Sequence, residues 1–554
     1  MTTHIDAPKT LAPRLSPNPC ARVAFVGAGP GDPGLLTVRG RDYLARADII
    51  VLDSLDLAER VRAYASPDVE FVDGSRRPCG RELSANSQAN LVVSTATEVA
   101  DPSVLVVRLM DGDPSAFNGL TLEASACHRA GVPFEIVPGV STAWSVPMYA
   151  GVPLTGSNTG QELHMIDGSD AQIDYSLSVS DVVTVVVLGC AGDLRRTLAG
   201  LVDAGRDPAT PVALTEHGTT VTQHTEVTTL ALALEALADD RAPEATVAVV
   251  GAQVDLRDEL SWYETKPLFG WKVIIPRTKE QSGGMVDRVA SYGASASVVP
   301  TISVEPPRTP QQMDKAIKGL VTGRYEWVGF TSVNAVRAVR EKFTAVGLDA
   351  RAFSGLKIAA VGGATADALM DWGLVPDLMP TSEHSARGLL EVWPPYDEVL
   401  DPINRVLLPR ADIATDTLIA GLQDMGWEVD DVTAYRTVRA SPPPAEVREA
   451  IKGGAFDAVC FTSSSTVRNL IGIAGKPHPR TVVACIGPAT AKTAEEHGLS
   501  VDVVAPTASA ESLVDALAAH ATDLADGYAA QGLPVQRPSE RRNGVSRGRS
   551  EARA

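Results

Sequence analysis

The sequence predicts an α/β protein with two or three separate cores, arranged in two successive regions. Short runs of β-branched residues alternate with helical patterns over residues 23–254 and again over 273–521. This alternation favours largely parallel sheets with helices on their faces. The chain has 554 residues, about three to four times the length of a typical domain. Because ligands of such sheets bind beyond the carboxyl ends of the strands, the residues that follow each strand are the first candidates for a site.

Composition and charge narrow the class of protein. Hydrophobic residues make up 44% of the chain, and its formal net charge is −19. This charge argues against a nucleic-acid partner held through phosphates, but a locally basic pocket can still bind an anionic substrate. No apolar run is long enough to span a membrane, and the first 20 residues show no secretory signal. The six cysteines form no CxxC pair, so we expect reduced thiols, no metal site and a cytoplasmic protein.

A glycine-rich turn follows the first expected strand, residues 23–26. The turn, GAGPGDP (residues 27–33), resembles GxGxxG but has Asp32 at the final glycine position. Its prolines also stand where a cofactor-binding helix should begin, so a phosphate-binding loop is not expected. A close approach of this backbone to a ligand stays open.

The next strand, residues 49–52, leads into Asp53. An acid at this place faces the crevice, which makes Asp53 a candidate proton acceptor; a loop cap is the alternative. Small or acidic residues follow four later strands, which suits a ligand held largely by backbone groups. These strands are expected at residues 104–109, 134–137, 182–188 and 212–214.

Four motifs of this region carry a family resemblance: GAGPGDPGLLT, GDP, VPGVSTAWSVPMYAGVPLT and ALTEHGT, in this order. Over residues 21–265 the chain resembles uroporphyrinogen-III C-methyltransferases, which belong to the tetrapyrrole methylase family. The resemblance implies two α/β lobes with S-adenosylmethionine bound between them. A pyrrole carbon would attack the positioned methyl group, and a base, placed on Asp53, would remove the displaced proton. The resemblance places cofactor contacts on Pro30, Asp111, Gly112, Asp113, Ala116, Ser141, Thr142, Leu188 and Gly218.

The same region departs from the family at positions that are expected to be basic. Ser54 stands where an arginine follows the base, Gly119 stands where another arginine is usual, and Gly156-Ser157 replaces a His-Arg pair. Asp111 replaces the first glycine of the family's GGDP. Arginine-carboxylate pairs are strong contacts, so these losses weaken the expected hold on a polycarboxylate. Two interpretations follow: the region methylates uroporphyrinogen-III, or it is an altered, non-catalytic module that binds the cofactor.

The C-terminal region contains an internal repeat. WVGFTSVNAVRAV (residues 327–339) matches AVCFTSSSTVRNL (residues 458–470), KIAAVGGATADALMDWGL matches VACIGPATAKTAEEHGL, and PTSEHSARGLL matches PTASAESLVDAL. The separation is far longer than that of solenoid repeats. We therefore expect two similar α/β lobes that face one cleft.

Each repeat has a strand that ends in Phe-Thr-Ser and a later Gly-x-Ala-Thr turn, both followed by a helix. Side chains in these turns are expected to cap the helices, at about 1 kcal/mol each. Helix N-termini also attract anions, so a polyanionic ligand is the functional interpretation and capping without a ligand is the alternative. The residues concerned are Thr331, Ser332, Thr365, Thr462, Ser463 and Thr490.

The motifs VIIPR, FTSVNAV, LLPRAD, AYRTV, FTSSSTV and IGPATA occur in this order over residues 270–520. This order resembles uroporphyrinogen-III synthase. The resemblance implies two lobes, residues 272–304 with 439–520 and residues 305–438, joined by two strands. It implies that hydroxymethylbilane is cyclised to uroporphyrinogen-III, a hydro-lyase reaction, without a metal or cofactor.

Three further residues are candidates for this chemistry. Tyr435 matches the family's tyrosine and is expected to hydrogen-bond the departing hydroxyl; a buried phenol that satisfies a carbonyl is the alternative. Arg277 and Arg410 follow strands and are expected to hold substrate carboxylates. For both arginines, a solvated charge at a strand end is the alternative.

We therefore expect a fused enzyme of haem and corrinoid biosynthesis, in which the synthase makes uroporphyrinogen-III and the methylase consumes it. One alternative is a synthase with a regulatory S-adenosylmethionine-binding module; another is a solute-binding protein, which the missing export signal disfavours. The expected partners are small tetrapyrroles, without nucleic acid or membrane, and a homodimer through the methylase domain is a possible assembly. Residues 1–20 are expected to form a disordered lead-in and residues 531–554 a disordered tail.

Overall fold

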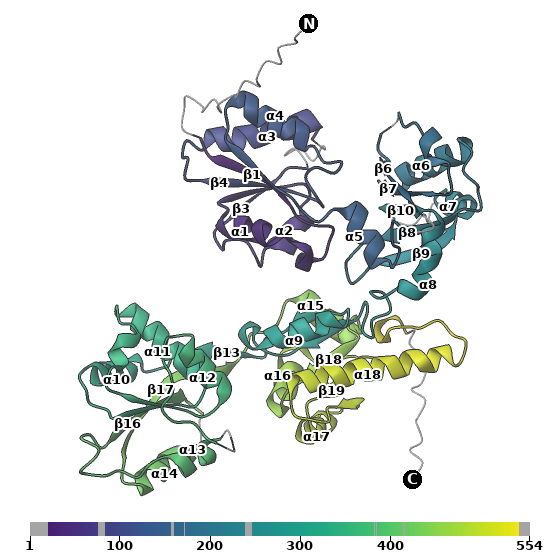
Figure 1. Cartoon of the computed structure of the whole chain (residues 1–554). Helices are drawn as coiled ribbons and strands as arrows, with labels where there is room; N and C mark the ends of the chain where they lie inside the picture. The colour runs from purple at the N-terminus through teal and green to yellow at the C-terminus, as the bar shows by residue number, and fades with distance from the viewer. Residues whose placement is uncertain are drawn as a thin grey trace. The chain divides into compact units, whose positions relative to one another are not determined.

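The structure is a computed structural model that describes residues 20–75, 83–156, 160–170, 172–238, 246–381, 383, 385–413 and 416–541, without the side chains of 279–281. The chain divides into two compact units, residues 1–271 with 289–295 and residues 272–288 with 296–554. Figure 1 labels many of the elements of both units. The expected lead-in lies, except for Cys20, outside the described residues.

The first sheet of the N-terminal unit is parallel and buried on both faces. Its strands are runs of β-branched and other apolar residues, which suits a sheet covered by helices on both sides. Helices α1 and α2 pack on one face and α3 and α4 on the other (Figure 1). The strands β1 (Arg22–Gly27), β2 (Ile49–Leu52), β3 (Glu70–Asp73), β4 (Leu105–Met110) and β5 (Phe134–Val137) lie in the order β3-β2-β4-β1-β5; the helices are η1 (Pro33–Leu35), α1 (Val38–Arg46), α2 (Asp56–Val61), α3 (Ala85–Glu98) and α4 (Leu120–Ala130).

The second sheet of this unit is mixed, whereas the sequence pattern favoured a largely parallel one. Strand β10 runs antiparallel to both of its neighbours, β7 and β8, and β9 returns antiparallel to β8. Helices α6 and α7 cover one face and α5 the other. The elements are α5 (Thr142–Tyr149), β6 (Glu162–Asp167), η2 (Ser176–Ser178), β7 (Val183–Leu188), α6 (Ala191–Asp203), β8 (Pro211–Glu216), β9 (His224–Thr229), α7 (Leu230–Ala236), β10 (Val247–Val250), η3 (Ala252–Leu256) and α8 (Arg257–Leu260), with strand order β6-β7-β10-β8-β9.

One sheet of the C-terminal unit takes its strands from both ends of the unit. Strands β11, β18, β19 and β20 pair in parallel, and helices such as α16 bury apolar side chains against them. The elements are β11 (Lys272–Ile275), α9 (Lys279–Ser291), β12 (Ser295–Val298), α15 (Ala445–Gly453), β18 (Ala458–Phe461), α16 (Ser464–Ala474), β19 (Val482–Cys485), α17 (Pro488–Glu496), β20 (Val503–Val504) and α18 (Ala510–Ala529), with strand order β12-β11-β18-β19-β20.

The other sheet of this unit takes its strands from the middle of the sequence. Its longest strand, β17, pairs in parallel with β16 and antiparallel with β13. The strands are β13 (Ile302–Glu305), β14 (Trp327–Phe330), β15 (Lys357–Ala360), β16 (Arg405–Ala411) and β17 (Glu428–Arg439), in the order β13-β17-β16-β14-β15; the helices are α10 (Pro310–Val321), α11 (Val333–Ala345), η4 (Ala350–Phe353), α12 (Gly363–Met370), α13 (Ala386–Val392) and α14 (Thr417–Asp424).

The segment that follows α18 contacts the first of these two sheets. A short helix, η5 (Pro538–Glu540), includes the buried Pro538, and the Ser539 amide donates to Asp457 at 2.8 Å. Arg480 donates to the Arg541 carbonyl at 2.9 Å. A disordered tail is therefore not what the structure shows for residues 531–541, and the rest of the expected tail lies outside the described residues.

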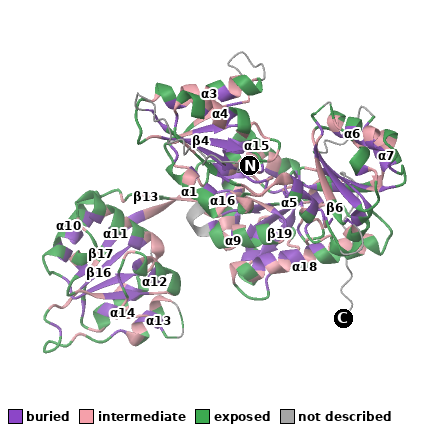
Figure 2. Cartoon of the chain, turned by 45° about the horizontal axis from the view of Figure 1, so that its top comes forward, coloured by how far each residue is buried: buried purple, intermediate pink, exposed green. Residues whose placement is uncertain are grey.

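Burial follows the sheets in both units. Figure 2 shows strands that are mainly buried and helices whose outer faces are exposed. Among the described helices, none is long and apolar enough to cross a membrane.

Candidate functional site

Three strand ends of the N-terminal unit meet backbone to backbone. Gly29 and Gly112 exchange two hydrogen bonds of 3.1 and 3.0 Å between the turn after β1 and the loop after β4. A Cβ atom on Gly27 would lie 2.5 Å from the Cα of Gly139, which follows β5. Such contacts exclude any side chain at this crossing. The glycines of the sequence motifs therefore bring the loops together.

A cavity of about 240 Å³ lies beside this crossing, and residues of both sheets of the unit line it. The second sheet contributes residues that include Asp167 and Gly189, and Thr246 precedes β10. The structure thus collects motif residues that are far apart in the sequence. Seven of the nine expected cofactor residues line the cavity: Asp111, Gly112, Asp113, Ala116, Ser141, Thr142 and Leu188.

The other two expected cofactor residues, Pro30 and Gly218, do not line this cavity. They lie where the turn after β1 meets the loop after β8. A Cβ atom on Gly31 would lie 2.7 Å from the Gly218 carbonyl oxygen, and the Asp32 amide donates to Thr219 Oγ1 at 3.0 Å. This contact joins the two parts of the unit.

Asp53 lies at the end of β2, and both of its carboxylate oxygens accept hydrogen bonds. Arg108 donates to Oδ1, and the amide of Asp111 donates to Oδ2 at 3.1 Å. Arg108 is 1% exposed and also donates to Glu123 at 2.8 and 2.9 Å. Burial alone would lower the pKa of Arg108, but Glu123 and Asp53 outweigh burial and raise it. The guanidinium therefore stays charged and fixes the orientation of Asp53.

Arg60 is a residue of this site that the sequence reasoning missed. It belongs to α2 and donates to Asp111 Oδ1 and to the Gly29 carbonyl, both at 3.1 Å. Desolvation raises the pKa of Asp111, and the charge of Arg60 acts against this rise. No motif marks Arg60, because its role depends on where α2 lies and not on the neighbouring sequence.

In the C-terminal unit, Tyr435 lies on β17 and is 7% exposed. Its hydroxyl is 3.0 Å from Ser332 Oγ. Ser332 is the N-cap of α11 and accepts the Ala335 amide at 3.2 Å, so this predicted cap is present. The structure therefore brings together two residues of the expected site that are about a hundred positions apart.

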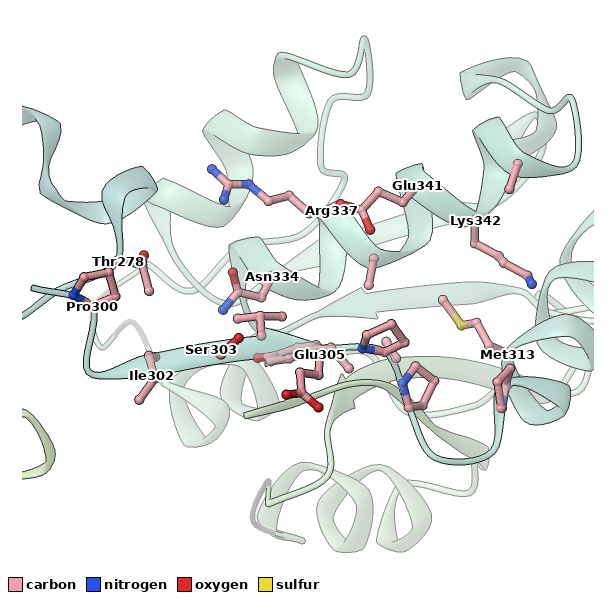
Figure 3. Close-up of a pocket in the computed structure, with 18 residues that line it drawn as sticks. Thr278, Pro300, Ile302, Ser303, Glu305, Met313, Asn334, Arg337, Glu341 and Lys342 are labelled. Atoms are coloured by element: carbon pink, nitrogen blue, oxygen red, sulfur yellow. The ribbon is translucent and has the colours of Figure 1, made fainter. Parts of the chain in front are cut away.

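A cavity of about 650 Å³ extends from Tyr435 along α11 (Figure 3). The cavity is lined by β13, the loop before α10, α10, α11 and β17, together with Thr278 and Pro300 from connections of the other sheet. Asn334, Arg337 and Glu341 lie along one face of α11 and also line it. The sequence reasoning missed these three, although their spacing of three and four residues places them on the same side of a helix.

The second Phe-Thr-Ser turn has the same local form. Ser463 caps α16 and accepts the Thr466 amide at 3.3 Å. Thr331 and Thr462 precede the caps, so the prediction that they cap is wrong; each serine takes the role. Of the four residues in the two turns, none lines the cavity, Ser332 included.

Thr365 and Thr490 were also predicted to cap helices, and the structure contradicts this. The N-caps are Gly362 and Gly487, without a side-chain hydrogen bond. Both threonines therefore lie inside the first turn, where they are 5% and 4% exposed. Their side chains pack inward, because the helices begin two residues before them.

The two expected carboxylate-binding arginines have different surroundings. Arg410 is 7% exposed, donates to Asp431 Oδ2 at 2.7 Å and contacts Asp416 at 3.1 Å; Asp431 is the main cause that raises its pKa. Arg277 is half-buried beside the cavity residue Thr278, and burial lowers its pKa. Arg410 thus joins two strands of one sheet, whereas Arg277 lies next to the cavity.

Two family models match the chain, one in each unit. The model of tetrapyrrole (corrin/porphyrin) methylases matches residues 22–233. The model of uroporphyrinogen-III synthase HemD matches residues 284–515.

Similar proteins cover one or both units. The porphyrin biosynthesis protein HemD of Ruminiclostridium josui is 30% identical over 504 residues, which are 89% of this chain and 97% of that protein. The uroporphyrinogen-III C-methyltransferase of Bacillus subtilis is 29% identical over 367 residues, 65% of this chain and 74% of that protein.

Among solved structures, the uroporphyrin-III C-methyl transferase of Thermus thermophilus, complexed with S-adenyl homocysteine, is 30% identical and covers 42% of this chain and 99% of its own, with a TM-score of 0.36. The uroporphyrinogen-III synthase of Thermus thermophilus is 18% identical and covers 46% of this chain and 98% of its own, with a TM-score of 0.27.

Proposed function

We infer the function from the families to which the chain belongs. Its N-terminal unit belongs to the tetrapyrrole (corrin/porphyrin) methylases, and its C-terminal unit belongs to the HemD uroporphyrinogen-III synthases. It is a bifunctional enzyme of tetrapyrrole biosynthesis. The synthase cyclises hydroxymethylbilane to uroporphyrinogen-III, and the methylase transfers methyl groups to that product from S-adenosylmethionine. The observation that carries this function is that seven motif residues line the cavity of the N-terminal unit, while Asn334 and Tyr435, from two motifs of the synthase, line the cavity of the C-terminal unit.

The residues of the N-terminal cavity fit S-adenosylmethionine. Asp111, Asp113 and Asp167 give its wall a negative character, which suits the positive sulfonium and ammonium groups. Gly112 and Ala116 leave room for a flat adenosine group. When bound, the cofactor supplies an activated methyl group to a nucleophilic carbon.

Asp53 is the proton acceptor of the proposed methyl transfer. Its orientation is fixed by Arg108 and by the Asp111 amide, and a carboxylate with two hydrogen bonds keeps further lone pairs for a proton. Fixed geometry of this kind is the main requirement when the methyl donor is already activated. Arg108 and Glu123 therefore act as positioning residues.

Tyr435 is the hydrogen-bond donor of the proposed cyclisation. Ser332 Oγ accepts the Ala335 amide, and its own hydroxyl proton is free to point at the Tyr435 oxygen 3.0 Å away. Tyr435 can then direct its proton to the hydroxyl that leaves hydroxymethylbilane as water. The carbon left behind is attacked by the fourth ring, and the cavity holds the chain in the folded form that this attack needs.

Incubation of the purified chain with hydroxymethylbilane, with and without S-adenosylmethionine, tests both activities. We expect uroporphyrinogen-III without the cofactor and methylated products with it, identified by chromatography and mass spectrometry. Formation of the type-I isomer alone would contradict the synthase. Formation of the type-III isomer without methylated product would contradict the methyltransferase and favour the regulatory alternative.

We also propose a cytoplasmic homodimer. Among the described residues, five cysteines are free thiols, which suits a reducing compartment. Trp144, Met148 and Trp262 expose apolar surface on the N-terminal unit, as a subunit interface would. A monomer mass in light scattering would contradict the dimer, and recovery outside the cytosolic fraction would contradict the location.

A further inference from the structure

Arg60 is a basic residue that lies next to the methyl-donor cavity without lining it. It contacts Asp111, which lines the cavity. The amide of the same Asp111 donates to the proposed base, Asp53. One residue thus separates Arg60 both from the cofactor space and from the proton acceptor.

Two departures from the family occur together at this point. The arginine expected after the base is replaced by Ser54, and the first glycine of GGDP is replaced by Asp111. A glycine at position 111 would offer no carboxylate to Arg60. The ion pair of 3.1 Å, together with the hydrogen bond to the Gly29 carbonyl, holds the guanidinium beside Asp111, whose amide donates to the proposed base.

The guanidinium keeps donors for a ligand. Its contacts with Asp111 and Gly29 use two of the five N–H donors that arginine carries. The Arg60 side chain is 26% exposed, so part of it reaches solvent. A planar donor edge of this kind matches a carboxylate in geometry and charge.

We propose that Arg60 binds a carboxylate of the tetrapyrrole substrate in the methylase unit, in place of the arginine missing at position 54. The assignment rests on the proposed methyltransferase function. Asp111 holds the guanidinium beside the cavity, and the N–H donors that remain take the substrate group. Arg60 therefore offsets part of the loss of basic residues that the sequence shows.

The test compares Arg60→Ala, Arg60→Lys and wild type in the full chain, with uroporphyrinogen-III supplied directly. In Arg60→Ala, we expect the KM for uroporphyrinogen-III to rise about 10- to 100-fold, the range for loss of a charge-assisted hydrogen bond. The Kd for S-adenosylhomocysteine, measured by calorimetry, should change less than about threefold. The KM of Arg60→Lys should lie between those of the wild type and Arg60→Ala, because lysine keeps the charge but not the planar donor edge.

Arg62→Ala is the matched control. Arg62 lies just after α2, is exposed and stacks on Phe71, so its loss should leave the KM unchanged. An unchanged KM in Arg60→Ala would overturn the assignment. An equal rise in the KM and in the Kd for S-adenosylhomocysteine would overturn it too, because Arg60 would then only shape the cofactor loop.

Asp111→Asn adds a second, independent measurement. It weakens the contact that holds the Arg60 guanidinium, so the KM for uroporphyrinogen-III should rise about two- to tenfold when Arg60 is present and rise less in Arg60→Ala. The KM is measured at saturating S-adenosylmethionine, because Asp111 also lines the cofactor cavity. Equal effects in both backgrounds would contradict a role of Arg60 in substrate binding. If the wild type transfers no methyl group, the proposed function fails and the Arg60 assignment fails with it. If the wild type transfers methyl groups, the variants test the Arg60 assignment alone.

Discussion

The two copies of the repeat in the C-terminal unit share a local structure but differ in what surrounds them. In both, a buried strand ends in Phe-Thr-Ser, and the serine caps the next helix. Ser332 also bonds Tyr435 beside the larger cavity. The Ser463 hydroxyl oxygen instead lies 2.8 Å from the Ser465 hydroxyl oxygen, in its own turn. The two copies therefore have the same local scaffold, and strand β17 brings Tyr435 to the first copy.

Removal of the Tyr435 hydroxyl should remove the contact that distinguishes the first copy of the repeat from the second. In Tyr435→Phe we expect the rate of uroporphyrinogen-III formation to fall about 100-fold, the lower range for removal of a general acid. The rate is measured by stopped assay of the two isomers. The ratio of type-I to type-III product should rise, because hydroxymethylbilane then has time to close without the enzyme.

Tyr325→Phe is the control for this change. Tyr325 lies in the same lobe and donates to Asp430 at 2.7 Å, but it does not line the cavity. Its loss should affect stability and leave the rate intact. Equal rates for Tyr435→Phe and wild type would remove Tyr435 from the chemistry.

The anchoring of β17 can be weakened without touching Tyr435. Arg410→Ala breaks the pair with Asp431, and we expect the lobe to lose about 1–3 kcal/mol, less than for a fully buried pair because Asp431 is 43% exposed. Arg405→Ala breaks the Arg405–Glu428 pair on the same two strands, which is more exposed, and should cost under about 1 kcal/mol. Urea unfolding of the two variants measures the difference. Equal losses would mean that Arg410 does not anchor the strand.

Substitution of the two capping serines should separate an effect on stability from an effect on catalysis. Ser332→Ala and Ser463→Ala should each lower the local free energy of unfolding by about 1 kcal/mol, measured by amide hydrogen exchange in α11 and α16. Only Ser332→Ala should also slow cyclisation, by about two- to tenfold, because Tyr435 loses one hydrogen bond. A similar slowing in Ser463→Ala would show that both copies take part in the reaction.

Sequence reasoning located the parts of the site that local motifs determine. Asp53 and Ser332 follow from a strand end and a turn whose form is set by a few neighbouring residues, whereas Tyr435, inside β17, was predicted from the family resemblance. Arg60 could not be located, because its role depends on how α2 packs against two distant loops, whereas the helical spacing of Arg337 with Asn334 and Glu341 was a signal that was missed. The substrate contacts expected of these motif residues remain predictions.

The capping predictions show that a helix start misplaced by a few residues gives a side chain the wrong role. The Gly-x-Ala-Thr turns were recognised, but their helices begin immediately after the glycines at positions 362 and 487. A shift of three positions turns an exposed cap into a buried side chain, as in Thr365 and Thr490. Composition likewise predicted a tail from residue 531, whereas Pro538 is buried against its own lobe. Tertiary contacts decided both cases.

The glycine crossing of the N-terminal unit has a consequence for redesign. Gly27 and Gly139 approach so closely that even the methyl group of alanine has no room. The smallest possible enlargement would push apart the loops that carry the cavity wall, whereas Phe117, which also lines the cavity, is about half exposed. A library that aims to change the accepted methyl donor should therefore keep these two positions constant and vary exposed positions such as Phe117.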